Sequence, residues 1–154
     1  MDLSGDLLSQ VYTILNQKVI PTSSELLKML EFKPLKLPFS VDFTVSLNLL
    51  SQLDTLIIDY IEKVLGKPLE NVQEIRQAIQ KQHLDMLSPD CSCLITDIEE
   101  INLTSDLTTI ESKPLIFAKL PDGTLQEEWV WKFDTKMTYH SGCITYFKVK
   151  AVKI

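Results

Sequence analysis

The chain has 154 residues, of which 45% are apolar and 23% are charged. This length and composition predict a single folded domain over 1–154 and exclude wholesale disorder. The formal net charge of −6 argues against general nucleic-acid binding, because that binding needs lysine and arginine side chains to neutralise phosphates.

The N-terminal residues and the cysteine count bear on location. The first ten residues contain two aspartates and no basic residue, which is unlike a secretory signal. No apolar run approaches the ~20 residues that a membrane-spanning helix needs. The three cysteines are an odd number, which favours free thiols in a reducing compartment. We therefore expect a cytoplasmic protein that binds neither membranes nor nucleic acids.

Helical periodicity begins near the N-terminus. Apolar residues recur every three or four positions from Leu3 to Leu15, which predicts a first helix. Thr22 stands three residues before Glu25, which is the spacing of a capping box. This spacing predicts a second helix that continues to about Phe32.

One strand and two longer helices complete the mainly helical part, residues 1–90. Apolar and polar residues alternate over 35–45, which predicts a strand. Pro38 within it favours a place at a sheet edge or a bulge at that position. The broadest apolar stripe of the chain predicts a helix over 47–65. A fourth helix is expected over 69–86.

The C-terminal part, residues 91–154, predicts an antiparallel sheet. A strand is expected over 93–103, with a bulge near Glu99 where the apolar residues change face. A second strand is expected over 114–120. It leads into Asp-Gly at 122–123, which predicts a tight two-residue hairpin.

The last two strands are expected to form a long hairpin. Apolar residues at alternate positions predict one strand over 124–139, and Gly142 closes a short loop before a return strand over 143–153. In this register Lys148 lies opposite Asp134. The predicted order is α-α-β-α-α-β-β-β-β. This is an α+β fold in which about four helices, interrupted by one edge strand, pack on a curved antiparallel sheet.

Four residues have the composition of a structural zinc site: Cys91, Cys93, His140 and Cys143. In a simple meander of the C-terminal strands, however, Cys93 and Cys143 lie at opposite ends of a sheet that spans ~30 Å, at about 3.3 Å per residue. We therefore expect free cysteines and no metal or other cofactor. The zinc site is a minor alternative that would require another strand order.

One face of the predicted hairpin is rich in aromatic side chains. It carries Glu127, Trp129, Trp131, Phe133, Met137 and Tyr139. Such a stripe most often packs as core. On a curved sheet the same residues would instead line a pocket against the helix over 47–65, which would suit a carrier or an enzyme for a small apolar ligand.

The opposite, outer face of the hairpin mixes lysines with large side chains: Lys132, Lys136, Ile144, Tyr146, Lys148 and Lys150. An apolar patch rimmed by charge is typical of a partner surface. The sequence contains no recognisable catalytic motif, and no catalytic residue is assigned. We expect a non-enzymatic adaptor or inhibitor that binds a protein partner, and associates with itself, through this outer face.

Overall fold

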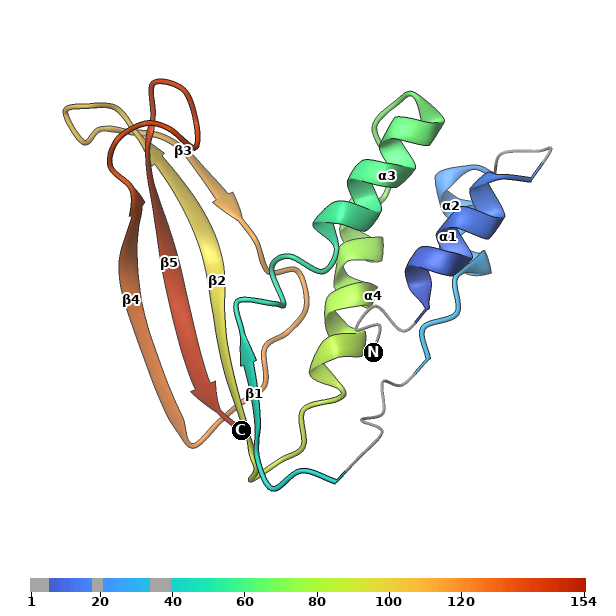
Figure 1. Cartoon of the computed structure of the whole chain (residues 1–154), viewed down its shortest axis with the longest axis horizontal. Helices are drawn as coiled ribbons and strands as arrows, with labels where there is room; N and C mark the ends of the chain where they lie inside the picture. Colours follow the sequence, from blue (N-terminus) through green and yellow to red (C-terminus); the bar gives the residue numbers. More distant parts are fainter. Residues whose placement is uncertain (1–5, 18–20, 34–39) are drawn as a thin grey trace. The chain divides into compact units, whose positions relative to one another are not determined.

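The computed structural model describes residues 6–17, 21–33 and 40–154. Helices and a five-stranded mixed sheet form an α+β fold, and the elements follow the predicted order (Figure 1). The chain divides into two compact units. The helical unit contains the described residues up to Val41 together with 52–87 and 117–120, and the sheet unit contains the remainder. The single domain expected from chain length stays a prediction.

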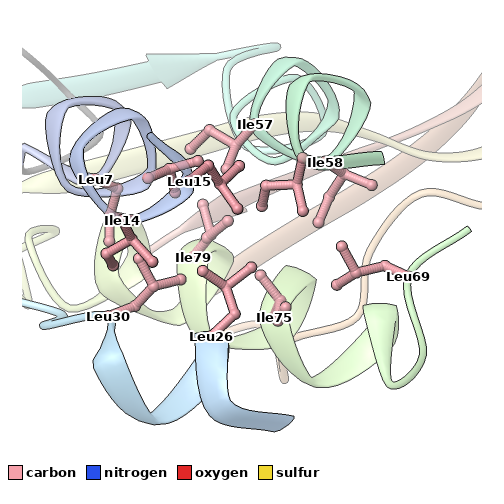
Figure 2. Packing of buried hydrophobic residues seen from close by; sticks show 12 residues of the cluster. Leu7, Ile14, Leu15, Leu26, Leu30, Ile57, Ile58, Leu69, Ile75 and Ile79 are labelled. Atoms are coloured by element: carbon pink, nitrogen blue, oxygen red, sulfur yellow. The ribbon is translucent and has the colours of Figure 1, made fainter. Parts of the chain in front are cut away.

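The helical unit contains four α-helices. They are α1 (Leu7–Leu15), α2 (Ser23–Met29), α3 (Thr55–Leu65) and α4 (Val72–Leu84). Their apolar stripes meet in one buried cluster (Figure 2). The cluster consists of Leu7, Val11, Ile14, Leu15, Leu26, Leu30, Ile57, Ile58, Ile61, Leu69, Ile75 and Ile79. Within the described part of the chain, no helix is long and apolar enough to cross a membrane.

The predicted capping box at the start of α2 is confirmed. The hydroxyl of Thr22 accepts the backbone N–H of Glu25, and the Glu25 carboxylate accepts the backbone N–H of Thr22 at 2.8 Å. Helix α2 nevertheless ends at Met29, before the predicted limit at Phe32, because Leu30 is already extended. The predicted start of the first helix, residues 3–5, lies outside the described residues.

Helix α3 is shorter than predicted at its N-terminal end. The prediction of helix from residue 47 is wrong, because Leu47 is the last residue of a strand and pairs with Ile95. Asn48 follows with φ +48°, a left-handed conformation that interrupts regular structure. Turns lead from there to Thr55, where α3 begins.

Helix α4 also begins a few residues later than predicted, after Asn71, whose φ of +58° is left-handed. A buried polar cluster holds it to the rest of the helical unit. Asp54 is fully buried, forms an ion pair with Arg76 and accepts a hydrogen bond from Gln80 at 3.1 Å. Burial raises the pKa of Asp54, although the Arg76 charge acts in the opposite direction.

The sheet unit contains five strands. They are β1 (Thr44–Leu47), β2 (Ser92–Leu103), β3 (Thr109–Pro114), β4 (Leu125–Asp134) and β5 (Ile144–Lys153). Their order is β1-β2-β5-β4. Strand β3 also pairs with β2, along 99–103, whereas β1 pairs with β2 along 92–95. All pairs are antiparallel except β1 with β2, so the purely antiparallel sheet of the prediction needs this correction. The long strands curve, as expected (Figure 1).

Strand β1 covers only the end of the predicted strand over 35–45. Residues 34–39 lie outside the described residues, and residues 40–43 are not in a strand. Among the described strands β1 pairs with β2 alone, which is the predicted edge position; Pro38 itself lies outside the described residues. The predicted bulge in β2 is also confirmed, since its pairing with β5 shifts register between Asp97 and Glu99.

The predicted strand over 114–120 and its Asp-Gly hairpin are wrong. The real strand, β3, ends where the predicted one begins. The backbone N–H groups of Phe117 and Ala118 donate instead to the side chain of Gln80, at 2.7 and 3.1 Å. Gly123 is required for a close approach, because a Cβ there would lie 2.2 Å from the carbonyl oxygen of Lys153.

The β4–β5 hairpin is confirmed, with a shorter first strand. Asp134 ends β4, and its carboxylate accepts the backbone N–H groups of Lys136, Thr138 and Tyr139 at 2.8, 2.5 and 2.6 Å. These hydrogen bonds shape the turn that replaces the predicted strand end. Gly142 has the expected left-handed φ of +80°.

The register of the hairpin differs from the prediction at one pair. Asp134 lies opposite Thr145, and Lys148 lies opposite Val130, so the expected pairing of Lys148 with Asp134 is wrong. The cause is the register shift between Trp131 and Asp134, which places three steps of β4 against two steps of β5.

Candidate functional site

The β4–β5 register places Trp129 and Trp131 on one face, as predicted. Met137 and Tyr139 lie in the turn after β4, where strand alternation no longer applies, and Met137 has a left-handed φ of +58°. Trp129 lies opposite Val149, and Trp131 lies opposite Phe147. Side chains that are directly opposite in an antiparallel pair share a face, so these residues belong to one surface. We name Trp129, Trp131, Phe133, Tyr139 and Phe147 the aromatic face.

Four rings of the aromatic face contact one another. Phe133 is central, with its ring centroid 5.0 Å from that of Trp131, 5.1 Å from that of Tyr139 and 5.1 Å from that of Phe147. All three contacts are edge-to-face, a geometry favoured by the ring quadrupoles. The rings therefore support each other in fixed positions.

The outer members of the aromatic face are exposed. Trp129 and Trp131 are each 42% exposed, Phe133 is 40% exposed and Tyr139 is 51% exposed, whereas Phe147 beneath them is 7% exposed. The interpretation of the stripe as solid core is therefore wrong for its β4 members. The pocket expected between the sheet and the helix over 47–65 stays a prediction.

An open hollow of about 360 Å³ adjoins the aromatic face at Tyr139. Its lining comes entirely from the sheet unit: Glu100, Asn102, Ile110, Glu111, Lys113, Tyr139, His140 and Cys143. Glu100 accepts a hydrogen bond from Asn102 at 3.0 Å and lies 2.9 Å from Nε2 of His140. The Tyr139 ring lies 4.4 Å from the imidazole, so the hollow and the rings form one continuous surface.

Sequence reasoning did not find Glu100 and Asn102 as members of this surface. They reach it because β2 pairs with β5, which places Glu100 opposite Phe147 and Asn102 opposite Thr145. The bulge before Glu99 determines which face they occupy. The bulge was visible in the sequence, but the pairing of β2 with β5 was not.

Carboxylates predominate around the aromatic face. Glu127 precedes Trp129 by two residues and lies on the same side of β4, and Glu100 and Glu111 line the hollow. Burial, with a smaller effect from the charge of Glu100, raises the pKa of the Tyr139 hydroxyl. Lys113 is the one lysine that lines the hollow.

Asp97 is a buried carboxylate on β2, in line across the sheet with Trp129 of the aromatic face. It lies opposite Val149, which lies opposite Trp129, and it is 3% exposed. Its Oδ1 has no hydrogen-bond partner among the described residues, and burial raises its pKa. Burying a charged oxygen without a hydrogen-bond partner costs free energy, so the surroundings of Asp97 favour its neutral form.

On the outer face, which was predicted as the partner surface, most of the lysines already interact with side chains of the same face. Glu128 accepts a hydrogen bond from Lys150 at 3.1 Å and forms an ion pair with Lys148 at 3.6 Å. The ammonium of Lys132 lies 5.9 Å from the centre of the Tyr146 ring. Ile144 contributes little free surface, since it is 8% exposed. Lys136 is exposed, but it lies in the turn after β4, where its backbone N–H donates to Asp134.

The four candidate zinc ligands are not brought together. The strand order is not the simple meander, but Cys93 lies opposite Lys153 while Cys143 adjoins Ile144 at the other end of β5. His140 pairs with Glu100 instead. Among the described residues, no group of three or more His, Cys, Asp or Glu side chains could hold a metal ion.

Comparison with known proteins finds no family model that matches the chain, no similar curated protein and no similar solved structure.

Proposed function

We propose that this chain is a non-enzymatic interaction protein and that its aromatic face binds a basic segment of a partner protein. The observation that carries the proposal is the exposure of four neighbouring rings, from 40% to 51%, on a surface edged by carboxylates. The class of function is the one expected from the sequence, but the proposed surface is the opposite face of the hairpin.

Exposed rings in this arrangement favour a protein partner. Tryptophan and tyrosine are enriched among the residues that dominate binding energy at interfaces, because each removes a large area from water. The contacts around Phe133 hold the rings in place, so little side-chain freedom is lost when a partner covers them. A contiguous exposed apolar patch on a polar sheet is also the usual mark of such a site.

The charges favour a basic partner segment. An arginine or lysine side chain can stack on the tryptophan rings and pair with Glu127 at the same time. The net charge of −6 would further raise the rate at which a basic segment meets this surface. An acidic segment would meet like charges.

The two tryptophans of the chain, Trp129 and Trp131, both lie on the aromatic face, so tryptophan fluorescence, excited selectively over tyrosine, reports on this surface. We expect an arginine-rich peptide to produce a saturable change in fluorescence, and a glutamate-rich peptide of equal length to produce none. Trp131→Ala should weaken the arginine-rich peptide at least ~10-fold, as the loss of an interface anchor does.

Val130→Ala provides the matched control. Val130 is on the same strand and 54% exposed, but it points to the outer face. We expect this variant to bind within about twofold of the unmodified chain, because surface truncations away from an anchor are nearly neutral. Equal losses in both variants, or no response to the arginine-rich peptide, would overturn the proposal.

A second candidate function rests on the hollow beside Tyr139. Its volume of about 360 Å³ and its Glu100–His140 pair suit a small ligand with a positively charged group. This is the sheet-unit counterpart of the small-ligand carrier or enzyme expected from the sequence. Histidine chemical shifts that respond to a panel of small amines, and lose the response in Glu100→Gln, would support this ligand site over a peptide surface.

A further inference from the structure

The outer edge of β4 is not paired within the described part of the chain. Strand β4 is ten residues long and pairs only with β5, so it lies at the end of the strand order (Figure 1). An edge strand presents a row of backbone N–H and C=O groups that can pair with another strand.

The two edge strands β3 and β4 differ in how they are protected. Strand β3 is six residues long, carries Glu111 and Lys113, and ends in Pro114, all features that oppose pairing with another chain. Strand β4 also carries charged residues and has a register shift between Trp131 and Asp134, but it is longer, lacks proline and exposes Trp129, Val130 and Trp131. The sequence thus protects one edge and leaves the other suited to pairing.

We infer that β4 pairs antiparallel with β4 of a second copy of this chain, about a twofold axis at Val130. In this register Val130 lies opposite Val130 of the second copy. Trp129 lies opposite Trp131 of the second copy, and Glu128 lies opposite Lys132 of the second copy. The twofold axis generates each of these last two pairs twice.

Geometry and charge select this register. Residues that lie directly opposite each other must share a face. Allowed registers therefore differ from one another by a shift of two residues of one β4 strand relative to the other. Glu128 and Lys132 do share the outer face, because Glu128 bonds to Lys150 and Lys132 lies over the ring of Tyr146. The register therefore matches opposite charges on one face and aromatic rings on the other.

The neighbouring registers are worse. Moving one way places Glu128 opposite Val130 and removes the charge pair. Moving the other way places Lys132 opposite Val130 and also removes the charge pair. The favoured pairing joins two five-stranded sheets into one and places both aromatic faces on the same side. This inference does not depend on a basic partner binding those faces.

The first test is the mass of the chain in solution by light scattering. We expect twice the 17.6 kDa chain mass, with dissociation on dilution. Val130→Lys should give monomers at concentrations where the unmodified chain is dimeric, because it places two lysines on the axis. Ile110→Lys is the matched control, since Ile110 is 55% exposed on the protected edge strand β3, and it should remain dimeric.

The second test addresses the register. Lys132→Glu and Glu128→Lys should each be monomeric, because each places like charges opposite one another twice. An equimolar mixture should form heterodimers in native mass spectra, because both charge pairs are then restored. Circular dichroism should first show that Glu128→Lys folds, since Glu128 also pairs with Lys148 and Lys150.

Three outcomes would overturn the inference: an unmodified chain that is monomeric up to its solubility limit, a dimeric Val130→Lys, or a mixture that fails to form heterodimers. Titrating monomeric Val130→Lys with the arginine-rich peptide tests the proposed function in the absence of dimerisation. In the unmodified chain, peptide binding without dimerisation would contradict the edge pairing alone, and dimerisation without peptide binding would contradict the basic partner alone.

Discussion

The two faces of the β4–β5 hairpin both carry large side chains, but they differ in what those side chains contact. On the aromatic face, Trp131, Phe133 and Tyr139 pack against one another through Phe133 and are still 40–51% exposed. On the outer face, Lys148 and Lys150 are paired with Glu128, and Lys132 lies over Tyr146. Charge pattern alone pointed to the lysines. The contacts show that Lys132, Lys148 and Lys150 already have partners within the chain, while the rings retain surface that a partner can cover.

Within the aromatic face, burial separates the ring that supports the surface from those that present it. Phe147→Ala should lower the free energy of unfolding by about 3–5 kcal/mol, because it removes a ring that is 7% exposed from beneath the others. Trp131→Ala should cost less, ~1–2 kcal/mol, because 42% of that side chain is already in water. Urea unfolding measures both. Equal losses would mean that Trp131 is core, against the comparison of the two faces.

The two faces should also separate in binding. Tyr139→Ala should lower the affinity for the arginine-rich peptide severalfold, because Tyr139 contacts both Phe133 of the aromatic face and His140 of the hollow. Tyr146→Glu, on the outer face, should leave peptide affinity unchanged. Isothermal titration of both variants measures the difference. The reverse result would restore the outer face as the partner surface, as the lysine pattern first indicated.

Asp97 allows a pH test beneath the aromatic face. Because burial raises the pKa of Asp97 above its unfolded value, ionisation of this group opposes folding at neutral pH. This destabilisation is complete above the folded pKa and disappears as pH falls below the unfolded pKa. Asp97→Asn should therefore raise the Tm at pH 7 by about 2–4 °C, the shift that ~1 kcal/mol produces in a chain of this size.

The control for Asp97 is the same comparison at acidic pH. The Tm of Asp97→Asn should approach that of the unmodified chain as pH is lowered, because both side chains are then neutral. A lower Tm for Asp97→Asn at pH 7 would show that the carboxylate is stabilised in the fold. The Asp97 carboxylate would then have a stabilising partner, although its Oδ1 has none among the described residues.

Local signals in the sequence predicted most of the fold. Periodicity and capping chemistry identified the four helices, the bulged strand β2 and the β4–β5 hairpin, because these features depend on residues close in the chain. Distant contacts decided the rest. Asn48 and the pairing of Leu47 with Ile95 moved the start of α3. The side chain of Gln80, 37 positions before Phe117, captured the peptide groups of the strand predicted over 114–120.

The candidate site was predicted in part for the same reason. Alternation along β4 and β5 placed Trp131 and Phe147 on one face correctly. The exposure of that face and the Glu100–His140 pair depend on which strand adjoins β5, and no local pattern encodes this. The Asp-Gly signal failed because Gly123 serves a close approach to Lys153 rather than a tight turn.

The smallest expected effect concerns Glu128 on the outer face. The hydrogen bond from Lys150, followed by the charges of both lysines, lowers the pKa of Glu128, so its contribution to stability is present at neutral pH and lost as pH falls through the folded value. Glu128→Gln should therefore lower the Tm only slightly at pH 7, and added salt should remove the difference, because exposed ion pairs are weak and screened. A large loss of stability would mean that the outer face depends on this carboxylate as a structural core does, and the lysines would then be part of the fold rather than a compensated surface.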